Sequence, residues 1–333
     1  MKIVVTGGRG FLGTHVCNSI QRQGGSPVAI GTADGDLKNP FVAHTLLREA
    51  DTIIHLAADV GGLGYLRDRS GSSFHDNHQM GLNVIAAACE GAASRLILAG
   101  TPCAYAADCP LPLRETALRV GVPSGDTAFY AFAKLATSHA AEALCPPHGV
   151  AVTTFIPSNM FGPHDNYAPH RSHVAAALLR KAIIARTVGE STFEVWGDGS
   201  ATRDFVYVTD VADMIALLAV NPHPSHAGQT FNLASGQETS MRQLAGVIAD
   251  VVGDVQPSFT TEKPVGYTHR VMSIAHARET LGYHPQTDLS DGLRQTHAWI
   301  HDSGLQRQWL AESLAEPGPP HLIPLTERRR HAG

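Results

Sequence analysis

The chain has 333 residues, enough for one or two domains with a large core, and a formal net charge of −5 at pH 7. A slightly acidic chain has no broad basic surface, which argues against nucleic acid as a partner. No apolar run approaches the ~20 residues that span a bilayer, and no signal-type segment precedes the first strand. We therefore expect a cytoplasmic protein with no membrane partner.

Cysteine and histidine are frequent enough to raise the question of disulfides and metal sites. The five cysteines are an odd number without a short secreted framework, which predicts free thiols. The 19 histidines are scattered, and neither a His-Glu-x-x-His run nor a Cys-x-x-Cys pair occurs. No metal site is predicted.

The chain begins with an apolar strand over residues 2–6, a glycine-rich turn and a helical pattern. The turn contains Gly7, Gly8, Gly10 and Gly13. Glycine permits a tight turn and lets the backbone approach a pyrophosphate at the N-terminus of the helix. The order of strand, turn and helix predicts a nucleotide site. The spacing alone leaves open whether Gly7 or Gly8 is the first glycine of the motif.

Apolar strands alternate with amphipathic helices through the first half of the chain. Further strands are expected at 26–30, 52–56, 95–99 and 151–156, and helices at about 77–90, 128–144, 174–186 and 241–252. This alternation predicts an α/β fold, in which a doubly wound parallel Rossmann sheet carries a smaller C-terminal α/β lobe.

The two domains are expected to interleave in sequence. Residues 1–161, with about 204–235, are predicted to form the dinucleotide-binding domain, and 162–203 with 236–300 the substrate lobe. Residues 301–333 show no periodicity and are expected to be a partly disordered tail. The outer faces of the helices near 77–90 and 128–144 suit either a second subunit or the core.

Tyr130 and Lys134 are four residues apart on an expected helix and so lie on one face, about one turn apart. An ammonium there can lower the pKa of a phenol, which is normally near ~10. Such a phenol can pass a proton to or from a substrate oxygen while hydride moves. The spacing is common by chance, but behind a glycine-rich turn it indicates a nicotinamide enzyme that acts on a carbinol or ketone.

Several longer segments make the chain resemble the extended short-chain dehydrogenase/reductase family of nucleotide-sugar enzymes over roughly residues 1–300. They are Pro157–Asn166, Ser172–His173, Leu178–Arg180, Trp196–Gly199 and Arg203–Phe205. The resemblance implies a homodimeric enzyme that epimerises a GDP-4-keto-6-deoxyhexose at C3 and C5 and reduces it at C4. A further stretch, Leu56–Tyr65, is similar to sister enzymes with bound NAD, which implies the alternative of a redox-neutral GDP-mannose 3,5- or 5-epimerase.

The resemblance implies catalytic roles for five side chains. Thr101 would share the substrate C4 oxygen with Tyr130 and Lys134, Cys103 would be the epimerisation base, and His173 the acid on the opposite face. A C4 ketone acidifies the hydrogens at C3 and C5, so a thiolate of ordinary pKa ~8.5 can remove them. The family pattern is broken by a proline between Thr101 and Cys103. Without the resemblance, Thr101 could be a hydroxyl that satisfies the backbone at a strand end, Cys103 a buried structural thiol and His173 a surface histidine. The whole chain could then be a nucleotide sensor that has no catalytic activity.

Binding residues are implied in the same way. Coenzyme contacts are expected from Gly7, Arg9, Gly10, Phe11, Leu12, Gly13, Asp36, Leu56, Ala57, Ala58, Asn77, Ala99, Tyr130, Lys134, Pro157, Asn159 and Met160. Substrate contacts are expected from Asn159, His173, Arg180, Lys181, Trp196 and Arg203. Asn77 has the alternative role of a helix cap.

The kind of coenzyme depends on the residues after the second strand. An acid that ends this strand would select the free ribose of NAD, yet Ile30 is followed by Gly31, Thr32 and Ala33 before Asp34. Arg9 lies inside the glycine turn and can meet a 2′-phosphate. The prediction therefore favours NADP over NAD.

Overall fold

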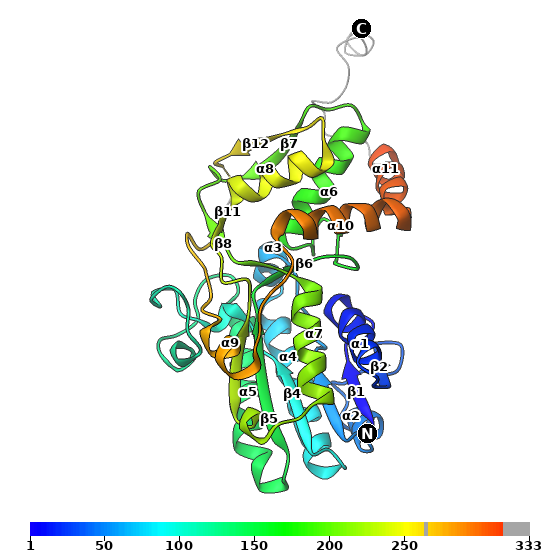
Figure 1. Ribbon diagram of the computed structural model, residues 1–333, viewed down its shortest axis with the longest axis vertical. Coiled ribbons are helices and arrows are strands. Elements are labelled where there is room, and N and C mark those ends of the chain that lie inside the picture. Colours follow the sequence, from blue (N-terminus) through cyan, green and yellow to red (C-terminus); the bar gives the residue numbers. More distant parts are fainter. Residues whose placement is uncertain (263–265, 316–333) are drawn as a thin grey trace.

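Six parallel strands form the central sheet, in the order β10-β5-β4-β3-β1-β2 (Figure 1). The computed structural model describes residues 1–262 and 266–315. The strands are β1 (Ile3–Thr6), β2 (Pro27–Ile30), β3 (Thr52–His55), β4 (Arg95–Ala99), β5 (Ala151–Pro157) and β10 (Gln229–Leu233). All five strand pairs are parallel. The predicted Rossmann sheet is confirmed, and β10 returns to it from late in the chain.

Helices cover both faces of this sheet. α1 (Phe11–Arg22) packs with α7 (Val208–Val220) on one face, and α4 (Ser70–Glu90) packs with α2 (Pro40–Leu47) and α5 (Ala128–Leu144) on the other. Successive strand residues feed the two cores. Val5 is buried with α1 and α7, whereas Val4 is buried with α2 and α4. Burial on both faces explains the continuously apolar strands.

A second core lies in the lobe drawn at the top of Figure 1. It is formed by α6 (Val174–Thr187), α8 (Met241–Val252), α10 (Leu289–Ser303) and α11 (Leu305–Ala315), with the parallel strands β7 (Thr192–Trp196) and β12 (Gln256–Thr260). Two short pairs lie between the core elements, β6 (Asn159–Phe161) with β9 (Phe205–Tyr207), and β8 (Thr202–Arg203) with β11 (Thr239–Ser240). The remaining helices of the described residues are α3 (Leu63–Asp68), α9 (Ala275–Leu281) and short 3₁₀ turns.

Two predicted elements differ from the structure. Helix α4 begins at Ser70, not near Asn77, because its first turns are held by polar contacts, including Asn77 Nδ2 to Ser73 O at 2.7 Å, and not by an apolar stripe. Residues 305–315 of the predicted tail form α11, whose Trp309 is only 4% exposed within the lobe core. Residues 316–333 of that tail lie outside the described residues.

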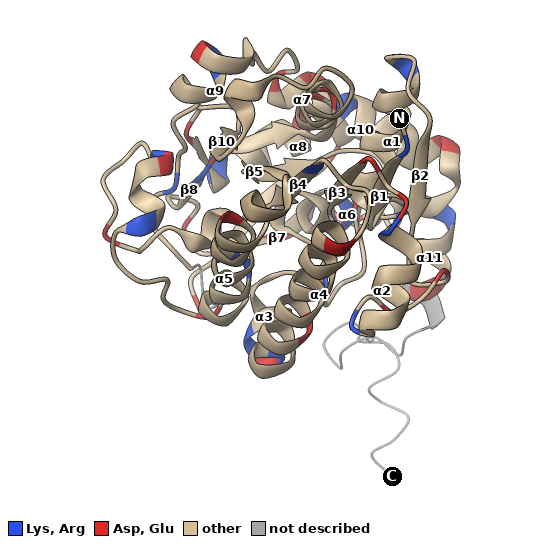
Figure 2. Cartoon of the chain, turned by 90° about the horizontal axis from the view of Figure 1, so that it is seen from below, with Lys and Arg blue, Asp and Glu red and all other residues tan. Residues whose placement is uncertain are grey.

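All five cysteines are free thiols, as predicted. Within residues 1–262 and 266–315, no helix is both long and apolar enough to cross a membrane. In Figure 2, the blue positions of Lys and Arg and the red positions of Asp and Glu are interspersed along the chain.

Candidate active site

The carboxyl ends of the central strands meet at one edge of the sheet, where the strand order reverses. β2 lies on one side of β1 and β3 on the other, so the switch point falls between β1 and β3. Ligands bind at such points in open α/β sheets. The segments that leave this edge are the glycine turn after β1, Leu56–Ala58 after β3, and Gly100–Cys103 after Ala99 at the end of β4. The predicted coenzyme and catalytic residues thus lie on neighbouring segments.

The glycine turn has no room for side chains. Gly7 has φ +66°, and a Cβ there would lie 2.7 Å from the Ala57 backbone N, while a Cβ at Gly13 would lie 2.1 Å from Gly7 O. The positive φ at Gly7, and not at Gly8, identifies Gly7 as the first glycine of the motif. Gly10 is the N-cap of α1 and supplies no side-chain cap. The N–H groups of the first turn, at Phe11 and Leu12, therefore have no side-chain cap, and binding of a pyrophosphate to them stays a prediction.

Arg9, which was predicted to meet a 2′-phosphate, forms an ion pair with Asp34. Arg9 Nη1 lies 2.6 Å from Asp34 Oδ2, which also accepts a hydrogen bond from Gly31 N at 2.8 Å. The Gly31 hydrogen bond, followed by Arg9, lowers the pKa of the Asp34 carboxyl. The sequence analysis set Asp34 aside as a ribose ligand because three residues separate it from Ile30. Arg9, which suits the 2′-phosphate of NADP, and Asp34, which suits the free ribose of NAD, therefore lie together.

Two other predicted coenzyme residues make contacts within the protein. Asp36 Oδ1 accepts a hydrogen bond from Lys38 N at 2.9 Å. Asn77 accepts from Asp59 N and donates to Asp59 O, both at 2.9 Å. Asn77 is not a helix cap, because α4 begins seven residues earlier at Ser70. Contacts of Asp36 and Asn77 with coenzyme stay predictions.

Tyr130 and Lys134 lie one turn apart on α5, with 8% and 6% of their surfaces exposed. Burial lowers the pKa of the Lys134 ammonium to about 8. Burial, and to a smaller extent the nearby Cys103, raises the pKa of the Tyr130 phenol. The predicted lowering of this pKa by Lys134 is therefore wrong in this structure. Desolvation disfavours the phenolate and the ammonium alike, and it is the largest cause of both shifts.

His55, at the end of β3, was missed by the sequence analysis. Its Nδ1 lies 2.8 Å from Thr6 Oγ1, and the ring is 2% exposed. Burial and then the Lys134 charge lower the pKa of His55 to about 3. The imidazole is therefore neutral at neutral pH and adds no second cation beside Lys134. The available sequence signal was a histidine that ends an otherwise apolar strand.

Thr101 and Cys103 lie on the first turn after β4. The buried Thr101 accepts a hydrogen bond from Cys103 N at 3.3 Å and so caps the 3₁₀ turn η1 (Pro102–Ala104). The unexpected proline opens this turn, where its fixed φ is suitable and no N–H is needed. The half-buried Cys103 interacts electrostatically with both Tyr130 and Arg203. The thiol thus shares one region with the predicted acid and the predicted phosphate ligand.

Arg203 has a second arginine beside it, Arg270. Arg203 Nη1 donates to Tyr267 O at 2.7 Å, and the Arg270 guanidinium lies 4.0 Å from the centre of the Tyr267 ring. Burial, followed by the charge of Arg270, lowers the pKa of Arg203. Arg270 is 8% exposed, and its buried Nη1 has no partner among the described residues. Two close arginines, one with an unused donor, suit a diphosphate. Sequence analysis missed Arg270, whose signal was a lone cation before an apolar run.

Asn159 follows the end of β5 at Pro157 and begins β6, with Met160 next in the strand. Its Nδ2 donates to Asp204 O at 3.0 Å. The buried Asp204 carboxylate accepts in turn from Ser158 Oγ at 3.1 Å and from the loop after β10. These bonds fix the direction in which the chain leaves the sheet and passes to the lobe.

His173 is the N-cap residue of α6 and is exposed at its surface. Although the residue is exposed, desolvation by nearby protein atoms lowers the pKa of its imidazole. Its ring makes no hydrogen bond with any residue that the structure describes. The preceding residue, Ser172, packs against Gly62 in the segment after β3. Opposition of His173 and Cys103 across a substrate ring stays a prediction.

Three residues predicted to bind substrate contact other parts of the lobe. Arg180 Nη2 lies 3.2 Å from a carboxylate oxygen of Glu312 in α11. Lys181 Nζ lies 3.1 Å from a Glu194 carboxylate oxygen and 5.4 Å from the centre of the Trp196 ring. Binding of substrate by Arg180, Lys181 and Trp196 stays a prediction. The observed contacts of these three residues join elements of the lobe to one another.

Comparison with protein families and sequences gives one consistent result. The model of the NAD dependent epimerase/dehydratase family matches residues 3–234. GDP-L-fucose synthase 1 of Arabidopsis thaliana is 32% identical over 303 residues, which cover 90% of this chain and 92% of the relative. GDP-L-fucose synthase of Escherichia coli (strain K12) is 27% identical over 313 residues, which cover 90% of this chain and 96% of the relative.

Solved structures show the same similarity. The crystal structure of a GDP-L-fucose synthetase from Naegleria fowleri bound to NADP has a TM-score of 0.82 and 26% identity, and the match covers 91% of this chain and 93% of that one. A GDP-6-OMe-4-keto-L-xylo-heptose reductase from C. jejuni has a TM-score of 0.81 at 21% identity, with 91% and 98% covered. The second similarity concerns the fold alone.

Proposed function

Because this chain belongs to the NAD dependent epimerase/dehydratase family, we propose that it inverts C3 and C5 of a GDP-linked 4-keto-6-deoxyhexose and reduces C4 with NADPH. Relatives named GDP-L-fucose synthase, one of them bound to NADP, support this assignment. The observation that carries it is the position of the Cys103 thiol beside Tyr130. An enzyme that only reduced a ketone would need no thiol beside its acid.

Inversion uses the side chains on either side of the sugar. The Cys103 thiolate removes the ring proton next to the C4 ketone, and hydrogen bonds from Tyr130 and Thr101 stabilise the resulting enolate. His173 then donates a proton to the opposite face, which inverts the carbon. Cys103 then releases its proton to water and His173 takes one from water, after which the second centre is treated in the same way. Two observations support these roles. Cys103 interacts electrostatically with Tyr130 and Arg203, and His173 lies at the N-terminus of α6.

Reduction uses the buried pair on α5. NADPH, when bound, supplies the hydride that adds to C4. Tyr130 donates its proton to the C4 oxygen, Thr101 shares that oxygen, and Lys134 orients the phenol and the coenzyme ribose. The raised pKa of Tyr130 keeps the phenol protonated and ready to act as the acid.

Coenzyme and substrate are bound by different parts of the fold. The uncapped α1 turn and Arg9 hold the coenzyme phosphates, and Arg203 with Arg270 holds the GDP diphosphate. The other residues implied by family resemblance complete the two sites. They are Asp36, Leu56, Ala57, Ala58, Asn77, Ala99, Pro157 and Met160 for coenzyme, and Asn159, Arg180, Lys181 and Trp196 for substrate.

We also propose that the protein is a cytoplasmic homodimer, whose domains divide at the boundaries predicted from the sequence. Helices α4 and α5 lie side by side in Figure 2, and α5 leaves Phe129 and Leu144 52% and 51% exposed. Apolar side chains on a long helix pair suit burial against a second copy.

Incubation of the purified protein with GDP-4-keto-6-deoxymannose and NADPH in D₂O tests the activity. We expect NADPH consumption and deuterium at C3 and C5 of the product. Cys103→Ser and His173→Asn should lose the deuterium, whereas Cys109→Ser, a matched half-buried thiol, should keep it. Conversion of GDP-mannose without added coenzyme, and without NADPH consumption, would instead support the redox-neutral epimerase.

A further inference from the structure

The segment after β3 packs closely against the residues that precede His173. Gly62 N donates to Arg171 O at 3.1 Å, and a Cβ on Gly62 would lie 2.7 Å from Ser172 O. A Cβ on Gly61 would lie 2.9 Å from the Tyr65 ring. Both glycines are thus required by close approach, and the backbone before His173 rests directly on this segment.

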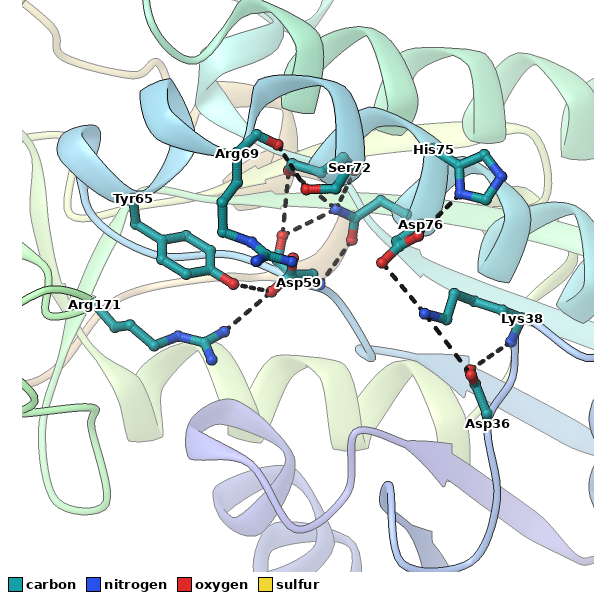
Figure 3. A network of polar contacts seen from close by, with 11 residues as sticks. Asp36, Lys38, Asp59, Tyr65, Arg69, Ser72, His75, Asp76 and Arg171 are labelled. Atoms are coloured by element: carbon teal, nitrogen blue, oxygen red, sulfur yellow. Dashed lines mark hydrogen bonds and ion pairs between the residues drawn. The ribbon is translucent and has the colours of Figure 1, made fainter.

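Side chains join the same two segments around the Asp59 carboxylate (Figure 3). Asp59 Oδ1 accepts from Tyr65 Oη at 2.5 Å and from Arg171 Nη2 at 3.1 Å. The Arg171 guanidinium also lies 4.5 Å from the centre of the Tyr65 ring. Arg69 approaches the other carboxylate oxygen at 3.5 Å. We call Asp59, Tyr65 and Arg171 the clasp. The Asp59 side chain is 19% exposed, so its hydrogen bonds are partly shielded from water.

The clasp is anchored on the helix that covers the sheet. Asn77, in α4, accepts from the backbone N of Asp59 and donates to its O, and Asn77 itself is 3% exposed. A continuous series of contacts therefore runs from α4 through Asp59 to Arg171 and the backbone before His173. The His173 ring makes no hydrogen bond of its own with a described residue. Its position depends on the backbone that the clasp holds and on the start of α6.

We propose that the clasp positions His173 for proton donation to the substrate ring, an inference that rests on the function proposed above. Asp59, Tyr65 and Arg171 are positioning residues, since they act through the backbone at 171–173 and not on the reacting atoms. Proton transfer needs the donor within hydrogen-bond reach of its target, so a displacement near 1 Å can reduce its rate by about 100-fold. Hydride transfer at C4 depends on Tyr130 of α5 and on the coenzyme, whose proposed contacts Ala58 and Asn77 are left unchanged in the clasp variants.

Product analysis after reaction in D₂O with GDP-4-keto-6-deoxymannose and NADPH separates the two steps. In Arg171→Gln and Tyr65→Phe we expect the ratio of inverted, deuterated product to uninverted reduced product to fall by about 10- to 100-fold. Arg171→Lys should restore part of the ratio, because it keeps a cation for Asp59. Arg67→Gln is the matched control, since Arg67 is an exposed arginine of α3, the helix of Tyr65, and pairs with Asp68 outside the clasp. NADPH binding should be unchanged in all four variants.

The outcomes distinguish the two proposals. A wild-type protein that incorporates no deuterium would overturn the proposed function itself. A wild-type protein that incorporates deuterium, with clasp variants that keep its product ratio, would overturn the clasp alone. Tyr65→Phe removes a single hydroxyl and is expected to fold, so the test does not depend on the stability of the arginine variants. A lower ratio in the control Arg67→Gln would equally count against the clasp.

Discussion

The coenzyme edge and the substrate side of this site are built in different ways. At the coenzyme edge, backbone meets backbone, and the close contact of Gly7 with Gly13 leaves no space for a side chain. On the substrate side, side chains from distant segments meet, as Asp59 and Arg171 do across 112 positions of sequence. A short local motif encodes the first arrangement, whereas the second depends on the tertiary fold. We therefore expect abrupt effects of substitution at the edge and graded effects on the substrate side.

The largest loss of activity is expected on substitution of Tyr130, because its proton serves both the reduction and the inversion. Tyr130→Phe removes the acid that serves both the ketone and the enolate, and general acid catalysis contributes ~10²–10⁴-fold. Hydride transfer from NADPH to the 4-keto substrate, followed by absorbance, should fall by about 1000-fold. NADPH affinity and the melting temperature should stay near wild type, because the ring remains in its buried place. Turnover within tenfold of wild type would remove Tyr130 from the mechanism.

An abrupt loss is expected at the coenzyme edge. Gly13→Ala would place a Cβ 2.1 Å from Gly7 O, a distance that the backbone must relieve by moving. NADPH affinity, measured by fluorescence titration, should weaken by at least ~100-fold, since the phosphate cradle is displaced. Gly71→Ala is the control. A Cβ there meets nothing within 4 Å, so the helical α4 should gain about 0.5–1 kcal/mol without loss of affinity. Equal affinity in both variants would contradict the comparison.

Burial of the Lys134 ammonium should lower the free energy of unfolding of the protein. Its folded pKa of about 8 lies below the ordinary value of 10.5, so the unfolded chain binds more protons between these values. The free energy of unfolding should therefore rise with pH across that window, and be lowest below pH 8. Lys134→Met should abolish this rise and add ~1–3 kcal/mol at pH 7, measured by urea unfolding, while reduction falls. An unchanged pH profile would show that Lys134 is better solvated than its surroundings indicate.

The smallest effect is expected in the substrate lobe, at a helix cap that lies beside the strand of Arg203 but outside the proposed catalytic side chains. Ser240 and Gln243 form a capping box at the N-terminus of α8. Ser240→Ala should cost about 1 kcal/mol of unfolding free energy, with turnover unchanged. Ser191→Ala, in an exposed loop of the same lobe, is the control and should have no measurable effect. A large loss of turnover in Ser240→Ala would show that the lobe couples to the site more tightly than this comparison holds.

Local sequence patterns predicted most helices and strands well, because the periodicity of apolar residues reflects which face of each element is buried. The bounds of α5 and α8 agree with the sequence expectation, and the buried strands follow their apolar runs. The start of α4 was missed because its first turns depend on polar contacts such as that of Asn77 with Ser73. An apolar period cannot reveal such a start, since no apolar stripe is present there.

The site was predictable where a motif fixes it and not where the tertiary fold does. The glycine turn and the buried Tyr130 and Lys134 pair came from spacing, although the direction of the Tyr130 pKa did not, because desolvation depends on what surrounds the ring. Asp34 was set aside as too distant from the second strand, and Arg270 was missed. Their relevance arises from neighbours, Arg9 in one case and Arg203 in the other, that lie far away in sequence.

Helix α11 has a practical consequence for anyone who shortens the gene. A stop codon after residue 303 would remove Trp309, whose ring lies 5.2 Å from that of Tyr167 in the lobe interior. The truncated product would keep every proposed catalytic side chain and yet carry an apolar hole open to water. We expect it to elute from a gel-filtration column as aggregate long before its kinetics can be assayed.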